Sequence, residues 1–359
     1  MPVFKSTELQ KILEDVLEAS GASKEESEVV ANLTVEAHLG GHDSHGTGSF
    51  VVYIRQILEG NIVPGAPLEV LKEDGAWLML DGNWGFGQVI VSRATRMAID
   101  KARASGTCTA TIRHCNHLGR LASYLRTAAE EGMVSVFMAN SHGQRGLVAP
   151  WGGIAPRLGT NPMGIGFPTG GDPFILDMTT CVAAAGKVAL SHTKRESTPE
   201  GWLIDSGGNP TTNPDALFED PPGSLLPLGG IAGHKGFGLG LAVEVLAGAL
   251  SGAGCTQWES TRGGNAVFLM VASIETFLPL AQFRSEIQRL MDYVKSSPTT
   301  SDVEQIQIPG ELEARHREKR VKEGILIDEN TWQQLLTAAD NVGLRWKPSR
   351  QALVQKSPS

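Results

Sequence analysis

The chain has 359 residues, of which 41% are hydrophobic and 19% are charged, a composition that supports a sizeable core and roughly two domains. Asp and Glu total 39 against 31 Lys and Arg, so the formal net charge is −8, and no block of like charge stands out. A nucleic-acid footprint is therefore not expected, and small-molecule chemistry is favoured. Residues 1–18 lack the apolar stretch and small-residue cleavage site of a signal peptide.

The four cysteines are too scattered for a structural metal site or a disulfide framework. None of them stands in a CxxC pair, and they do not form an obvious set of partners. We therefore expect no metal and a reducing, cytoplasmic location. The cysteines are Cys108, Cys115, Cys181 and Cys255.

Helices are predicted for the first 58 residues. Thr7 followed by Gln10, and Ser23 followed by Glu26, match the capping-box pattern, and each precedes a helical periodicity that ends at a glycine. Apolar residues recur at helical spacing again over residues 50–58.

An α/β pattern follows over residues 68–170. Strand-like runs at 77–80, 109–113 and 134–139 alternate with helical stretches at 91–105 and 122–131. Residues 191–233 are rich in Pro, Gly, Asn and Thr, which predicts a long irregular segment that lines a site or an interface.

The remaining elements are mostly helical. Residues 236–253 are apolar and as long as a membrane span, but Glu244 and five glycines favour a buried helix, so we expect no membrane partner. A strand is predicted at 266–272, and helices at 280–295 and 331–341.

No stretch matches the glycine pattern of a Rossmann dinucleotide site. Gly85 and Gly87 lack a third glycine, and the glycines that follow Lys235 have no strand before them. Lys235 itself precedes a glycine-rich helix start, where its charge would add to free backbone N–H groups and favour a phosphate. A solvated loop lysine fits the same spacing equally well.

Two histidines stand out as proton carriers. His45 follows Ser44 directly after the second predicted helix, and His117 follows a predicted strand. Imidazole suits a base that takes a hydroxyl proton near neutral pH, and Ser44 could orient the ring of His45. Three alternatives remain open: a metal pair of His42 with His45, a helix cap, and a structural role for His117 in a turn.

Seven motifs, in this order and rough spacing, resemble the malate/L-lactate dehydrogenase family of the non-Rossmann type. That family includes ureidoglycolate dehydrogenase, sulfolactate dehydrogenase, diketogulonate reductase and piperideine-carboxylate reductase. The motifs are HDSHG (42–46), NHLGR (116–120), APWGG (149–153), LGTNP (158–162), LDMTTCVAAAGK (176–187), PLGG with HKGFGL (227–239) and PGE (309–311).

The resemblance implies a homodimer with an α/β fold. A helical domain would combine residues 1–67 with 312–359, and residues 68–311 would form a mixed-sheet domain that binds NAD or NADP without a Rossmann fold. The implied reaction is hydride transfer between NAD(P) and a small 2-hydroxy acid. The alternatives are reduction of a diketo acid or a cyclic imino acid, and dinucleotide binding without turnover.

The resemblance also assigns roles to individual residues. His45 matches the proton donor and acceptor and Ser44 its relay partner, although His117 is an alternative base. Tyr53, Thr160 and Lys187 fall on the substrate side, and Lys187 favours a ketone over an imine. The cofactor positions are His117, Gly119, Arg120, Ser141, Asp177, Met178, Thr179, Lys235, Pro309, Gly310 and Glu311.

Two departures from the family pattern affect the substrate. Ser49 and Val52 stand where relatives commonly carry arginines that grip a carboxylate. Arg55 is predicted on a different helix face from Tyr53, so the two are not expected to act together. We therefore expect an apolar pocket mouth and a preference for monocarboxylates.

Overall fold

A mixed seven-stranded sheet forms the centre of the computed structural model, which describes residues 1–258 and 261–344. Within these residues β3 and β4 run parallel and the other neighbouring pairs are antiparallel, so the expected non-Rossmann mixed sheet is confirmed. In sheet order the strands are β2 (Glu69–Asp74), β3 (Trp77–Asp81), β4 (Thr107–Cys115), β11 (Gly264–Ser273), β5 (Met133–His142), β6 (Met163–Phe167) and β7 (Phe174–Met178).

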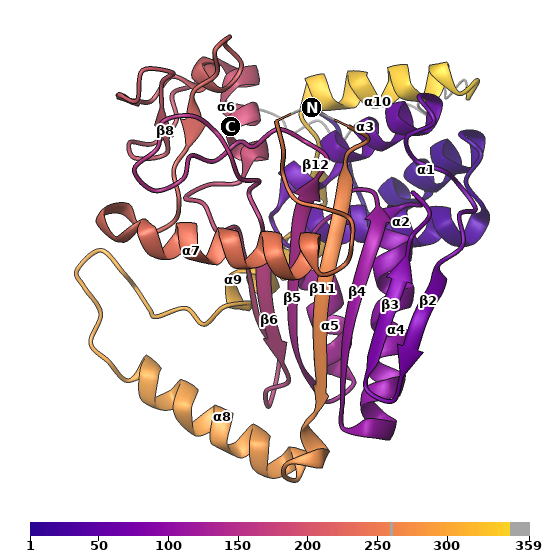
Figure 1. Cartoon of the computed structure of the whole chain (residues 1–359), viewed down its shortest axis with the longest axis vertical. Coiled ribbons are helices and arrows are strands. Elements are labelled where there is room, and N and C mark those ends of the chain that lie inside the picture. Colours follow the sequence, from indigo (N-terminus) through magenta and orange to yellow (C-terminus); the bar gives the residue numbers. More distant parts are fainter. Residues whose placement is uncertain (259–260, 345–359) are drawn as a thin grey trace.

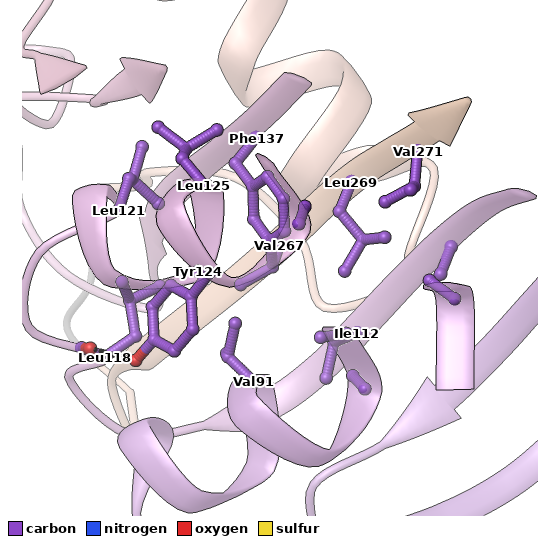
Figure 2. Packing of buried hydrophobic residues seen from close by; sticks show 14 of the residues in the cluster. Val91, Ile112, Leu118, Leu121, Tyr124, Leu125, Phe137, Val267, Leu269 and Val271 are labelled. Carbon is purple, nitrogen blue, oxygen red and sulfur yellow. Dashed lines mark hydrogen bonds between the residues drawn. The ribbon is translucent and has the colours of Figure 1, made fainter. Parts of the chain in front are cut away.

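Two helices, α4 (Gly87–Ser105) and α5 (Ala122–Glu130), pack on one face of this sheet (Figure 1). Figure 2 shows Tyr124 and Leu125 of α5 lying against Phe137 of β5, with Leu269 of β11 near by. Each of these side chains is at most 2% exposed, and burial of such a side chain contributes roughly 1.5–3 kcal/mol. The Tyr124 hydroxyl donates to the Leu118 carbonyl, which ties this core to the turn after β4.

Both ends of the chain contribute to a second apolar core. Phe4 stacks against Trp332 with ring centroids 4.9 Å apart, and apolar faces of four helices complete the cluster. The elements are β1 (Val3–Phe4), α1 (Ser6–Ala19), α2 (Lys24–Leu39), α3 (Thr47–Leu58), β12 (Ile325–Leu326) and α10 (Glu329–Asn341).

One of the two predicted helix starts is correct. Ser23 and Glu26 form the expected capping box at the start of α2. The box predicted at Thr7 is wrong, because Glu8 reaches back to the backbone N–H of Lys5 and α1 begins at Ser6.

We propose that the terminal segments, residues 1–67 and 312–344, form one domain and residues 68–311 the other, because each part supplies most of one apolar core; Phe86 and Val89 at the start of α4 join the core of the terminal segments. Residues 345–359 of the predicted helical domain lie outside the described residues.

The apolar stretch 236–253 is not the fully buried helix that its composition predicts. It forms α7 (His234–Val243) followed by a π-helical turn, η4 (Glu244–Ala249), and crosses the face of the sheet opposite α4 and α5 (Figure 1). Glu244 is buried, where it accepts hydrogen bonds from the side chains of Asn140 and Asn161. The outer face is apolar but exposed at Leu239, Leu241, Val245 and Leu250.

The segment predicted as irregular is partly ordered. It begins with α6 (Ala185–Lys194) and contains a three-stranded sheet of β10 (Ser224–Leu225), β8 (Leu203–Ile204) and β9 (Pro210–Thr211), with an apolar core that includes Val148 and Val188. Short helical turns are η1 (Asp43–His45), η2 (Pro214–Leu217), η3 (Gly230–Ala232) and η5 (Ile274–Thr276).

Two further helices follow β11. The first, α8 (Leu280–Lys295), contains no buried residue and projects from the body, and the second, α9 (Glu311–Glu323), returns to the terminal helices (Figure 1). No helix among residues 1–258 and 261–344 is long and apolar enough to span a membrane.

Candidate active site

The turn η1, which joins α2 to α3, carries Ser44 and His45. Ser44 Oγ lies 3.2 Å from Nδ1 of His45. Ser49, in the first turn of α3, donates its hydroxyl proton to the Ser44 carbonyl at 2.7 Å. Ser49 therefore holds the turn that carries His45.

Gly46 allows this turn to pack tightly on α2. A Cβ at position 46 would lie 2.2 Å from Nε2 of His38, a distance that no side chain tolerates. The backbone N–H of Thr47 donates to the same Nε2 atom at 2.9 Å, so the start of α3 is tied to the end of α2. The glycine of HDSHG is thus explained by a close approach rather than by its φ angle of −87°.

A second turn, after β4, carries His117. The Asn116 side chain donates to the carbonyls of Asn61 and Trp84 at 3.1 and 2.7 Å, and the Leu118 N–H donates to Asn265 Oδ1 at 3.1 Å. These amide contacts fix the backbone on both sides of His117.

The two turns bring His45 and His117 together. Their rings stack with centroids 5.6 Å apart and an interplanar angle of 19°. Tyr53, buried on α3, places its hydroxyl 2.6 Å from Nδ1 of His117. The three side chains form one cluster, and His45 and His117 are called the histidine pair below.

The surroundings keep both imidazoles neutral. Burial, together with the nearby His117, Arg120 and His42, lowers the pKa of His45 to about 3. Burial among protein atoms also lowers the pKa of His117 to about 4, although its ring is open to a cleft, where entering water screens part of the effect. Burial raises the pKa of Tyr53, so its hydroxyl keeps its proton.

His117 and Tyr53 face an open cleft of about 370 Å³, hereafter the α3 cleft. Ser49 and Val52, the two positions where the resemblance predicts arginines, lie on its wall, and among residues 1–258 and 261–344 no lysine or arginine lines it. Arg55 points away from it and pairs with Glu59 at 3.8 Å, as its predicted helix face requires. The other lining residues are Gln56, Ile62, Asn116, Ser141, Gln144, Gly263, Gly264 and Asn265.

A second cleft of about 360 Å³, hereafter the α5 cleft, lies between α2, α5 and α9. A small cavity lined by His45, Gly119 and Arg120 adjoins it and shares Arg120 with its wall. The histidine pair therefore stands between the two clefts. Further α5-cleft residues include Glu36, Ser123, Arg126, Asp177, Pro309, Gly310, Glu313 and Arg317.

Arg120 is the feature of the α5 cleft that most suits an anion. Burial lowers its pKa, and Asp177 and Glu313 attract it, yet it forms no ion pair or hydrogen bond within the described residues. A largely buried guanidinium without a partner is costly, and phosphate oxygens are the acceptors that match its fork. The residues of this cleft therefore fit the pyrophosphate of a dinucleotide.

Asp177 also lines the α5 cleft, but its carboxylate binds the start of α5. Its carboxylate accepts from the N–H of Ala122 at 2.9 Å, at the start of α5. Burial raises the pKa of Asp177 despite this hydrogen bond and the nearby charge of Arg120.

The other predicted residues lie in different places. Ser141 lines the α3 cleft, and Pro309 and Gly310 line the α5 cleft. Glu311 instead binds Lys295 and the N–H of Ile308. The walls of neither cleft include Met178, Thr179, Thr160, Lys187 or Lys235, and both lysines are exposed.

Sequence reasoning missed several residues that shape the site. The amides of Asn116 and Asn265 hold the His117 turn; Asn116 opens the NHLGR motif without having been assigned a role, and Asn265 directly precedes the predicted strand 266–272. The charged helix α9 supplies Glu313 and Arg317 to the α5 cleft. Its sequence has no apolar stripe that would have predicted a packed helix.

Comparisons with known proteins confirm the resemblance seen in the motifs. The family model described as malate/L-lactate dehydrogenase matches residues 4–336. The chain is 38% identical to a malate dehydrogenase of Pyrococcus abyssi, over 94% of both chains. It is 35% identical to an L-sulfolactate dehydrogenase of Methanocaldococcus jannaschii, over 95% of this chain and 98% of the relative.

Solved structures agree. A putative malate/lactate dehydrogenase from E. coli matches with a TM-score of 0.90 and 33% identity, over 98% of this chain and 97% of the other. The Δ1-piperideine-2-carboxylate reductase of Pseudomonas syringae matches with a TM-score of 0.78 and 27% identity, over 94% of this chain and 100% of the other. The chain therefore belongs to the malate/L-lactate dehydrogenase family and is an oxidoreductase of 2-hydroxy acids.

Proposed function

We propose that the chain interconverts a monocarboxylic 2-hydroxy acid and its 2-oxo acid with NAD or NADP, and that His45 is the acid and base. The observation that carries this proposal is the neutral histidine pair between two clefts. An imidazole that is neutral at working pH can accept a hydroxyl proton, and positioned proton transfer contributes typically ~10²- to 10⁴-fold to the rate.

The neighbours of His45 would then orient it. The Ser44 hydroxyl binds Nδ1 of His45 and leaves Nε2 free for the substrate hydroxyl. A proton that His45 takes from the substrate would then leave through Ser44. His117, fixed through its own Nδ1 by Tyr53, packs against the face of the His45 ring. His117 remains the second candidate for the base, because it faces the α3 cleft directly.

We place the dinucleotide along the α5 cleft. When bound, it would supply the carbon centre that accepts or donates the hydride. Arg120 would neutralise the pyrophosphate, while Asp177, Pro309 and Gly310 line the same wall. Gly119 follows the His117 turn and lines the small cavity beside His45.

We assign the substrate to the α3 cleft, with Tyr53 and Ser141 on its wall. The wall of this cleft offers Ser49, Val52 and neutral amides but no arginine or lysine. A second carboxylate on the substrate would lack a charged partner there, which supports the preference for a monocarboxylate. Thr160, Lys187, Met178, Thr179, Glu311 and Lys235 stay predictions from the resemblance alone.

Reduction of a cyclic imino acid or a diketo acid is the second candidate function. The similarity to a piperideine-carboxylate reductase over most of the chain favours it. Loss of turnover is less compatible with a site in which Ser44, His45, Tyr53 and His117 come together.

We also propose that the chain is a homodimer in a reducing, cytoplasmic compartment. Exposed apolar side chains gather on the outer face of α7 and η4, and α8 adds Leu290 and Tyr293, each more than half exposed. Exposed apolar side chains gathered on one helix face commonly mark a protein interface. Four free thiols, three of them buried, suit a reducing compartment.

The first prediction concerns pH. Because the pKa of His45 is about 3, the neutral base is present throughout pH 5.5–8, so kcat/KM for hydroxy-acid oxidation should not fall as the pH is lowered over this range. Reduction needs the protonated imidazole, whose fraction falls about tenfold per pH unit above that pKa, so kcat/KM for reduction should fall with rising pH. Steady-state assays in both directions measure these slopes.

His45→Ala is the companion variant. It should lower kcat in both directions by ~10²- to 10⁴-fold while dinucleotide affinity stays near that of the wild type. If kcat/KM for oxidation falls below about pH 6.5, or if the His45→Ala variant is fully active, the acid and base is another group.

The second prediction concerns the dinucleotide. Arg120→Ala should raise the Kd for NADH or NADPH by roughly ten- to a hundredfold, the range of a lost charge-assisted contact. Fluorescence titration gives the Kd, with Arg55→Ala as a control that removes an arginine outside both clefts. If Lys235→Ala raises the Kd and Arg120→Ala does not, the phosphate site lies at the start of α7.

The third prediction concerns the substrate. Val52→Arg should raise the ratio of kcat/KM for oxaloacetate to that for pyruvate by roughly ten- to a hundredfold, because it adds a fork for the second carboxylate. Leu58→Arg adds the same charge to an exposed part of α3 outside the α3 cleft and should leave the ratio unchanged. A wild type that already prefers oxaloacetate would contradict the proposal, and a panel with cyclic imino acids tests the second function.

The fourth prediction concerns the dimer. The wild type should sediment at twice the chain mass, and the double variant Leu241→Glu with Val245→Glu should sediment as a monomer, because two charges cannot be buried unpaired at an apolar interface. Leu58→Glu changes an equally exposed leucine on α3 and should remain a dimer. A monomeric wild type would refute this assignment.

A further inference from the structure

Asp43 opens the turn η1 and is held from two directions. From α2, Nδ1 of His38 lies 2.7 Å from Asp43 Oδ1. From α9, the Arg320 guanidinium binds both carboxylate oxygens, with Nη2 donating to Oδ2 at 3.0 Å and Nη1 to Oδ1. The same Nη1 donates to the His38 carbonyl at 2.6 Å.

The hydrogen bonds around His38 determine its protonation. A backbone N–H can only donate, so Nε2 of His38 must accept from the Thr47 N–H, and Nδ1 carries the proton that is donated to Asp43. His38 is thus a neutral bridge between the first residue of α3 and the first residue of η1. Burial would raise the pKa of Asp43, but the hydrogen bonds from His38 and Arg320 hold it well below its usual range.

Polar contacts attach α9 to this region. The helix has no fully buried residue. Arg317 pairs with Glu36 of α2, and Glu313 lies 3.1 Å from Nε2 of His42. The residue before α9 is Gly310, which lines the α5 cleft.

We propose that Asp43 and Arg320 are positioning residues, which set the geometry of the turn that carries Ser44 and His45 and connect it to the α9 wall of the α5 cleft. The inference rests on the proposed role of His45. Asp43 immediately precedes Ser44, so a shift of its carboxylate moves the backbone from which both Ser44 and His45 project.

A purely stabilising role predicts different behaviour. Partly exposed ion pairs contribute little to the free energy of folding, typically below ~1 kcal/mol. A misplacement of about 1 Å at a reacting group, in contrast, can lower the rate by ~10²-fold. The two roles are therefore separated by comparing kcat with the melting temperature and with the dinucleotide Kd.

The experiment compares three variants of one helix. Arg320→Ala should lower kcat by roughly ten- to a hundredfold, with the dinucleotide Kd and the substrate KM within about threefold of wild type. Arg320→Lys keeps a cation near Asp43 and should recover most of the lost kcat. Lys319→Ala, the matched control, removes a neighbouring cation that pairs only weakly with Glu323, and it should keep full activity.

A double variant identifies the route of the effect. If Arg320 acts through His45, then adding Arg320→Ala to His45→Ala should lower kcat no further, whereas independent effects would multiply. Asp43→Asn provides a second approach should Arg320→Ala fold poorly, and it should lower kcat in the same way.

The outcomes distinguish this inference from the proposed function. If His45→Ala loses activity while Arg320→Ala and Asp43→Asn keep wild-type kcat, the positioning role is overturned and the role of His45 stands. If His45→Ala remains active, the assignment of His45 fails first. Equal losses in Arg320→Ala and Arg320→Lys, or multiplicative losses in the double variant, would also overturn the positioning role.

Discussion

The contact between His45 and His117 is the point on which the candidate site depends. One ring comes from a turn between two helices of the terminal core, and the other from the end of a strand in the central sheet. Their stacking at 5.6 Å requires that the two parts of the chain dock in one way. Within the central part, a Cβ at Gly87 would lie 2.1 Å from the Asn116 carbonyl, so the start of α4 packs directly against the turn that carries His117. Burial at this junction lowers the pKa of His45, and burial among protein atoms lowers that of His117 less, because its ring also faces the water-filled α3 cleft.

Burial keeps the two imidazoles neutral, but it cannot neutralise the guanidinium of Arg120. A guanidinium remains protonated in a protein, so it cannot escape burial by losing its charge as a histidine can. The carboxylates of Asp177 and Glu313 are near enough to attract Arg120 but not to pair with it. Asp177 is engaged at the start of α5 and Glu313 at His42. Within the described residues the guanidinium of Arg120 therefore has N–H donors without an acceptor, and these donors, rather than the net charge of the junction, suit an anionic ligand.

Local periodicity predicted most of the sheet and the amphipathic helices, because strands such as β3 and β5 alternate buried and partly exposed residues. It failed where the contacts are between distant parts of the chain. The charged helix α9 has no apolar stripe and is held by ion pairs to α2, which no local pattern reveals. The stretch 236–253 looks buried because its outer face is as apolar as its inner one. For the site, the motifs located His45 and His117, but the cluster around Asp43 depends on residues 277 positions apart.

Ser49, where the resemblance leads us to expect an arginine, instead holds the turn that carries His45. An arginine at this position could not make the short hydroxyl contact to the Ser44 carbonyl, and Ser49 makes it at 2.7 Å. The turn is then held on three sides: by Ser49 from α3, by His38 from α2 and by Arg320 from α9. Among the described residues, the polar groups of the α3 cleft are hydroxyls, amides and an imidazole whose pKa is lowered. Such groups orient a ligand through single hydrogen bonds, so, if the α3 cleft holds the substrate as proposed, discrimination among 2-hydroxy acids depends on the shape and polarity of the substrate tail more than on its charge.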